Sequence, residues 1–142
     1  MGIFSKILGS GKELPRLETS HPAAARVGQV QDSLEKLAAD IPDRLEIVPA
    51  AKAVYVFAGK PPKQFGMFWI DGGELHNFKT LSREKGLNSL DLQPIVEKLR
   101  EVYKEHAAEE HYSLEVGGRP VVVTPSQSLA GKVEQIIQGV AG

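Results

Sequence analysis

The chain has 142 residues, 42% apolar and 25% charged, which is enough to bury one hydrophobic core in an ordinary globular domain. Its net charge of −1 gives no positive field for nucleic acid, and its lack of cysteine excludes disulfides, thiolate metal sites and cysteine nucleophiles. No apolar run approaches the about 20 residues that cross a bilayer, so we expect no transmembrane segment. A cysteine-free composition is also typical of a cytoplasmic protein.

Residues 2–9 are predicted to form a short amphipathic helix, followed by a flexible tether that extends to residue 21. The apolar positions share one helical face: Ile3, Phe4, Ile7 and Leu8. Two helical turns are unstable alone in water, so this segment must dock on something to fold. We expect a protein partner, and weak peripheral contact with a membrane through residues 2–9 remains an alternative.

The next part of the chain alternates helical and extended patterns. Residues 22–40 are predicted as one helix, because apolar residues recur there every three or four positions. Four extended segments follow, at 45–48, 53–58, 65–70 and 75–79. A second long helix is predicted over residues 92–108.

The last part contains a hairpin and a helix. Residues 111–116 and 119–124 flank Gly117-Gly118, and Thr124 with Pro125 is typical of the start of a helix. The whole order, α-β-β-β-α-β-β-α, predicts a single α+β domain over residues 22–142. We expect an antiparallel sheet of about five to six strands, built from hairpins and packed with three main helices.

Six of the nine aromatic residues lie within residues 55–78, and four of these six belong to the hairpin over residues 65–78. With Gly72-Gly73 as the turn, Asp71 pairs with Glu74, Trp69 with His76, and Met67 with Phe78. Both faces of the first strand are then apolar, so the sheet needs cover on both sides. That cover can come from helices of the chain, from a second copy or from a partner. In the last two cases we expect the anchors to be Phe65, Phe68 and Trp69.

Two histidines are candidates for binding a ligand or a metal. His76 opposite Trp69 could ligate haem or stack on a planar molecule, although a hydrogen bond within a packed sheet is the commoner role. His106 and Glu110 are four residues apart, a spacing that could hold a divalent metal on a helix, although a charged, solvated helix end is the commoner explanation. No motif predicts a bound cofactor, and no catalytic constellation is present.

The order of elements over residues 22–140 is similar to that of the type III secretion chaperones. Those are small α+β proteins, commonly dimeric, that hold extended segments of their partners. No residue motif accompanies the similarity, so it implies no functional residues. We expect a non-catalytic interaction module, either a small accessory subunit or a chaperone-like adaptor, that binds a protein partner or a second copy. The alternative is a small-molecule carrier, such as a haem carrier that uses His76 and the aromatic face.

Overall fold

The computed structural model describes residues 14–141, so the predicted helix over residues 2–9 lies outside the described part of the chain. The helices are α2 (Pro22–Gly28), α3 (Gln31–Asp40), α4 (Phe78–Lys85), α5 (Ser89–Glu105) and α6 (Gln127–Ala141). The strands are β1 (Leu45–Pro49), β2 (Val54–Lys60), β3 (Gln64–Asp71), β4 (Glu74–Asn77), β5 (Tyr112–Val116) and β6 (Arg119–Val123).

The six strands form one sheet in the order β4-β3-β2-β1-β6-β5. The predicted α+β fold is confirmed, but the sheet is mixed, because β1 and β6 run parallel while all other neighbours are antiparallel. In this parallel pair Glu46 lies across from Val122, which is 76 residues further along the chain. Alternation of apolar residues specifies the faces of each strand, but it does not specify such a long-range neighbour.

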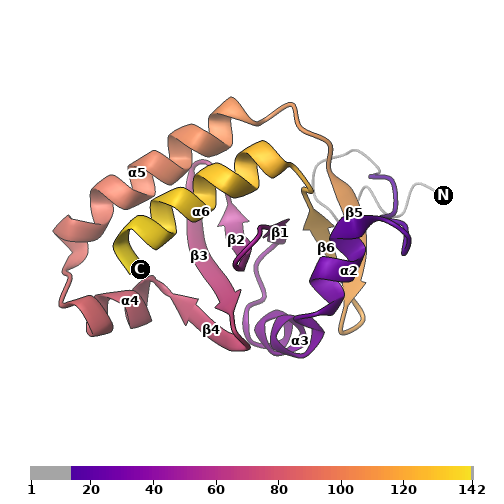
Figure 1. Ribbon diagram of the computed structural model, residues 1–142, viewed down its shortest axis with the longest axis horizontal. Helices are drawn as coiled ribbons and strands as arrows, with labels where there is room; N and C mark the ends of the chain where they lie inside the picture. Colours follow the sequence, from indigo (N-terminus) through magenta and orange to yellow (C-terminus); the bar gives the residue numbers. More distant parts are fainter. Residues whose placement is uncertain (1–13, 142) are drawn as a thin grey trace.

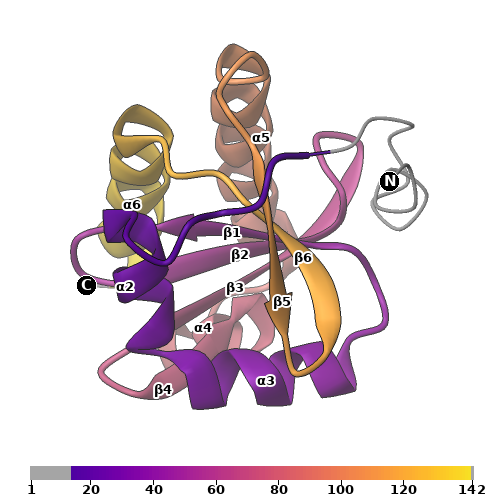
Figure 2. The ribbon, with the colours of Figure 1, turned by 90° about the vertical axis from the view of Figure 1, so that its right-hand side faces the viewer.

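Helices of the chain cover both faces of the sheet. In Figure 1, α5 and α6 lie side by side on one side of the sheet, and α2 and α3 lie on the other. Figure 2 shows the same arrangement from the side, with α5 and α6 above the strands and α3 below them. The second apolar face of the aromatic hairpin is therefore covered in part by the chain itself: Ile70 is buried and Phe68 half-buried, but Leu75 is 40% exposed.

The two faces have different cores. The side of α2 and α3 is almost entirely aliphatic, with Leu34, Leu37, Leu45, Ile47, Val54, Val56 and Val123 among its buried residues. The side of α4, α5 and α6 is rich in aromatic residues, and it includes Tyr55, Phe57, Met67, Trp69, Leu99, Leu129 and Ile137. Alternation along each strand sends neighbouring residues to opposite cores, as Ile47 and Val48 illustrate.

The hairpin register is confirmed except at its end. Trp69 pairs with His76 and Asp71 with Glu74, and the two turn glycines have φ angles of 60° and 81°. The predicted pair of Met67 with Phe78 is wrong, because β4 ends at Asn77 and Phe78 is the first residue of α4. The Asn77 side chain accepts a hydrogen bond from the backbone N–H of Thr80, which turns the chain from strand to helix.

The predicted helices also differ in number. The single helix expected over residues 22–40 is two helices, with α2 ending at Gly28 and α3 beginning at Gln31. Glycine is a poor helix former, and Val30 between the two helices packs against the aliphatic core. The described residues thus form five helices, where three main ones were expected.

Part of the predicted tether belongs to the folded domain. The backbone N–H of Leu17 donates to the carbonyl of Ser113, and the N–H of Ser113 donates to the carbonyl of Pro15. Leu17 is 2% exposed and lies in the aliphatic core. Residues 15–17 therefore pair with β5, the last strand in the order of the sheet. Within residues 14–141, no helix is long and apolar enough to cross a membrane.

Candidate functional site

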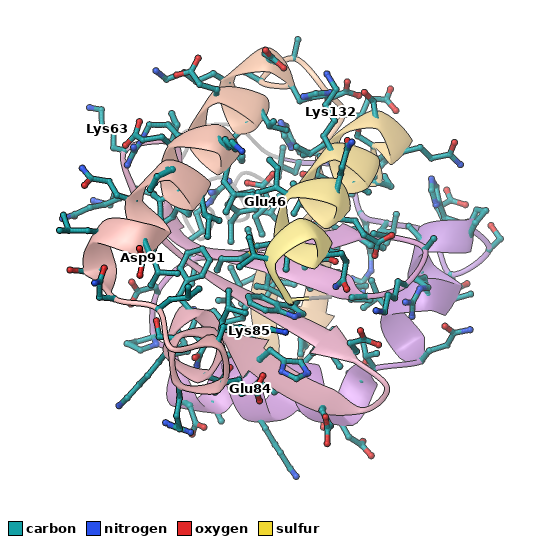
Figure 3. The ribbon with its side chains drawn as sticks, turned by 60° about the vertical axis from the view of Figure 1, so that its left-hand side comes forward. Glu46, Lys63, Glu84, Lys85, Asp91 and Lys132 are labelled. Atoms are coloured by element: carbon teal, nitrogen blue, oxygen red, sulfur yellow. The ribbon has the colours of Figure 1, made fainter. Side chains whose placement is uncertain are left out.

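The residues chosen from the sequence for ligand binding do lie together. The Trp69 and His76 rings stack, with centroids 5.8 Å apart and planes inclined by 20°. Both rings line a cavity of about 110 Å³, whose polar walls include Lys52, Asp71, Thr80 and Glu84. Figure 3 shows Glu84 on α4 at this side of the molecule. The cavity is far smaller than the roughly 300–1,000 Å³ of pockets that hold ligands, so its volume does not support haem binding.

The expected partner anchors are divided between the two cores. Trp69 is 2% exposed and packs against the aromatic side, where the half-buried Phe65 also lies. Phe68 is half-buried on the opposite, aliphatic side. The Arg100 guanidinium lies 5.8 Å from the centre of the Phe65 ring and covers it. Contact of these three residues with a partner stays a prediction, and it would have to use their small exposed edges.

The expected metal pair has other bonding partners. His106 is 8% exposed; its Nδ1 lies 2.8 Å from the Val102 carbonyl and its Nε2 lies 2.9 Å from the Ser128 hydroxyl. Because a carbonyl only accepts, Nδ1 carries the proton, and in the neutral ring Nε2 accepts from Ser128. Glu110 accepts from the Tyr112 hydroxyl, a hydrogen bond that raises the pKa of Tyr112. Among the described residues, no three His, Asp or Glu side chains are grouped to hold a metal.

A buried carboxylate that sequence reasoning missed lies on the α5–α6 side of the sheet. Glu46 on β1 is fully buried, and its two oxygens accept hydrogen bonds of 2.6 Å from Tyr103 on α5 and from Thr124 after β6. Arg44 lies 3.6 Å from one of these oxygens. In Figure 3, Glu46 is seen between α5 and α6. The only signal in the sequence was a single charged residue within an apolar strand.

His111 completes this network. Its Nδ1 lies 2.8 Å from the Thr124 hydroxyl and 3.6 Å from a Glu46 oxygen. Because the Thr124 proton is donated to Glu46, the Thr124 oxygen must accept, so Nδ1 of His111 carries a proton. Thr124 was predicted to cap the last helix; instead Ser126 accepts from the N–H of Leu129 there.

The hydrogen bonds of this network satisfy the Glu46 carboxylate inside the protein and do not present it to solvent. Burial, together with the charge of Glu46 and its hydrogen bond, raises the pKa of Tyr103 well above its usual value, so the phenol stays protonated and donates. No buried side-chain polar atom in residues 14–141 lacks a partner. With Glu46 fully covered, the arrangement joins β1, α5 and the end of β6, and it offers a substrate no access to the carboxylate.

A second polar group anchors α6 to the sheet. The Glu134 carboxylate accepts from the backbone N–H groups of Lys52 and Ala53 at 3.0 Å, and from the Tyr55 hydroxyl at 3.3 Å. Gln138 donates to the same hydroxyl. Burial is the main cause that raises the pKa of Tyr55 above its usual value. The turn before β2 is therefore fixed to the helix above it.

The outer surface of α5 and α6 is hollowed by a groove of about 480 Å³. Half-buried Val102 and Ile136 form its apolar floor, and charged residues of both helices form its rim. Lys132 on α6 lies 3.6 Å from Glu105 on α5, and Figure 3 shows Lys132 on the side of α6 that faces α5. An apolar floor between charged rims is the surface chemistry that accepts an amphipathic helix.

Comparisons with known protein families, with curated proteins and with solved structures found no match to this chain. The similarity to type III secretion chaperones therefore stays a similarity in the order of elements.

Proposed function

We propose that this protein is a non-catalytic interaction module of the cytoplasm, a small accessory subunit or chaperone-like adaptor that docks on a larger protein through residues 2–9. One observation carries the proposal: helices of the chain cover both apolar faces of the sheet within residues 14–141. This closure favours a docking surface outside the sheet, and residues 2–9 are amphipathic by sequence.

The chemistry of the segment suits a helix-in-groove contact. Its apolar residues are spaced to form one stripe: Ile3, Phe4, Ile7 and Leu8. Lys6 falls on the opposite side, where it would face solvent or an acidic rim of the partner. The alternative of a haem carrier gains no support from the cavity beside Trp69 and His76, because its volume is about 110 Å³.

Affinity capture with mutated segments tests the proposal. Tagged full-length protein, a deletion of residues 2–9, and the substitutions Ile7→Asp and Ser5→Asp are used to capture proteins from native lysate. Ile7→Asp and Ser5→Asp add the same charge, but only the first disrupts the apolar stripe. We expect a protein captured by the full chain and by Ser5→Asp to be lost with the deletion and with Ile7→Asp. Recovery of the same proteins by all four forms would refute docking through this segment.

A membrane partner is distinguished by the same variants. Co-sedimentation with anionic liposomes that depends on Ile7 but is lost at high salt would identify a lipid surface instead of a protein.

A further inference from the structure

We propose that the groove between α5 and α6 receives residues 2–9 of the same chain. The segment that docks on the partner is then held against its own domain until the partner displaces it. The regulatory role rests on the proposed function, whereas the contact itself does not.

The groove has the chemistry that the segment requires. Its floor consists of Val102 and Ile136, one from each helix, and both side chains are only partly covered. The segment presents four large apolar residues on one face, which would bury this floor. The cavity beside Trp69, in contrast, has mostly polar walls and does not match this apolar stripe.

The lengths also agree. The wall that α5 contributes to the groove extends from Glu97 to Glu105, which is roughly 12 Å at the helical rise of 1.5 Å per residue. A helix over residues 2–9 is also roughly 12 Å long. Two full turns of the segment would therefore lie along the whole wall.

The path of the chain leads toward the correct end of the groove. Residues 15–17 run parallel to β5, so residue 14 lies toward the start of that strand. The strand follows α5 after a short connection, and the bond between His106 and Ser128 joins the end of α5 to the start of α6 there. From residue 9 to residue 14 the extended chain spans at most about 17 Å.

The charges are complementary. Residues 2–12 contain Lys6 and Lys12 and no acidic residue. The groove lining contains three glutamates and two lysines, and its glutamates follow one stripe of α5 at Glu97, Glu101 and Glu105. Each of these glutamates already has a cation of the domain nearby, because Arg100 pairs with Glu97, Lys104 lies 3.5 Å from Glu101 and Lys132 lies 3.6 Å from Glu105. A basic segment would therefore share the glutamates with these side chains, and the lining itself keeps one more negative than positive residue. A neutral or acidic helix would lack this attraction.

Paramagnetic relaxation in the full chain tests the contact, because the protein has no native cysteine. A spin label on Ser5→Cys should lower the amide signals of residues 97–105 and 132–136 about twofold or more, because the proposal makes the docked state the major one. Adding Ile7→Asp should restore these signals. Adding Ser10→Asp, which places the same charge in the tether, should leave the signals reduced.

Dilution identifies the occupant. An intramolecular contact gives the same broadening after about tenfold dilution, whereas a contact between copies weakens. Broadening that weakens would assign the groove to a second copy, and broadening absent from the groove or located on α2 and α3 would also overturn the proposal. Either result leaves the capture experiment unaffected, so failure of this contact is distinguishable from failure of the proposed function.

Discussion

The two faces of the sheet bury different types of residue. The side covered by α2 and α3 buries aliphatic residues, and Leu34, Leu37 and Ile47 are each at most 2% exposed there. The side covered by α4, α5 and α6 buries Tyr55, Phe57 and Trp69. It also contains the buried carboxylate of Glu46, the cavity beside His76 and the groove between α5 and α6.

The α2–α3 side is therefore stabilised mainly by burial of apolar area, whereas the α5–α6 side also depends on particular hydrogen bonds. An aliphatic core is stabilised by burial without direction, so its residues tolerate exchange for others of similar volume. A hydrogen-bonded network has fixed partners, and removal of one member leaves the others buried and unsatisfied. The α5–α6 side should therefore be the more sensitive to small chemical changes, and the following predictions test that comparison.

The largest effect is expected at Glu46. Glu46→Ala removes the acceptor for Tyr103 and Thr124 and should lower the free energy of unfolding by roughly 3 kcal/mol. The neighbouring change Ile47→Val, on the aliphatic side, should cost roughly 1 kcal/mol. Urea unfolding followed by circular dichroism measures both. Equal losses for the two variants would contradict the distinction between the sides.

A smaller effect is expected at the start of α5. The Asn88 side chain accepts from the backbone N–H of Asp91, and Asp91 accepts from the N–H of Asn88. Asn88→Ala should lower the free energy of unfolding by about 1 kcal/mol, because the first turn of the helix loses its cap. The exposed Leu90 is the control, since Leu90→Ala lies in the same turn and removes no capping bond. A loss no larger than that of the control would show that packing alone fixes this helix end.

The smallest effect on stability at neutral pH is expected from substitution of the two buried tyrosines, and their main effect is expected at alkaline pH. Their pKa values are raised above the ordinary 10.0, chiefly by burial, so both phenols stay protonated in the folded protein. Above pH 10 the unfolded chain ionises first, so unfolding releases protons and stability falls as the pH rises. Melting temperatures between pH 9 and 11 should fall less steeply in Tyr55→Phe and in Tyr103→Phe than in the wild type. An unchanged slope in both variants would show that neither phenol causes the alkaline loss.

The sequence predicted local features well where one signal was strong. Gly72-Gly73 identified the turn, and the register placed Trp69 opposite His76 because two residues fit between the strands. It failed where a polar side chain decided a helix end. Asn77 and Asn88 cap the first turns of α4 and α5, although neither helix start was expected there.

Sequence reasoning brought some of the chosen side chains together and missed others, and their binding roles stay predictions. His76 and Trp69 do share a cavity, since both belong to one hairpin and the register brings them together. His106 was chosen for its spacing to Glu110, but its ring bonds to Val102 and Ser128. Glu46 was missed because its partners lie 57 and 78 residues away in the chain.

By itself, the sequence determined the α+β class, the aromatic hairpin and the amphipathic character of residues 2–9, because these follow from local periodicity and turn residues. Only the tertiary structure decided that β6 lies parallel to β1, that helices of the chain cover both faces, and that Glu46 meets Tyr103 and Thr124. Those contacts join distant segments, and they form because burying apolar area and satisfying buried polar groups are properties of the whole chain.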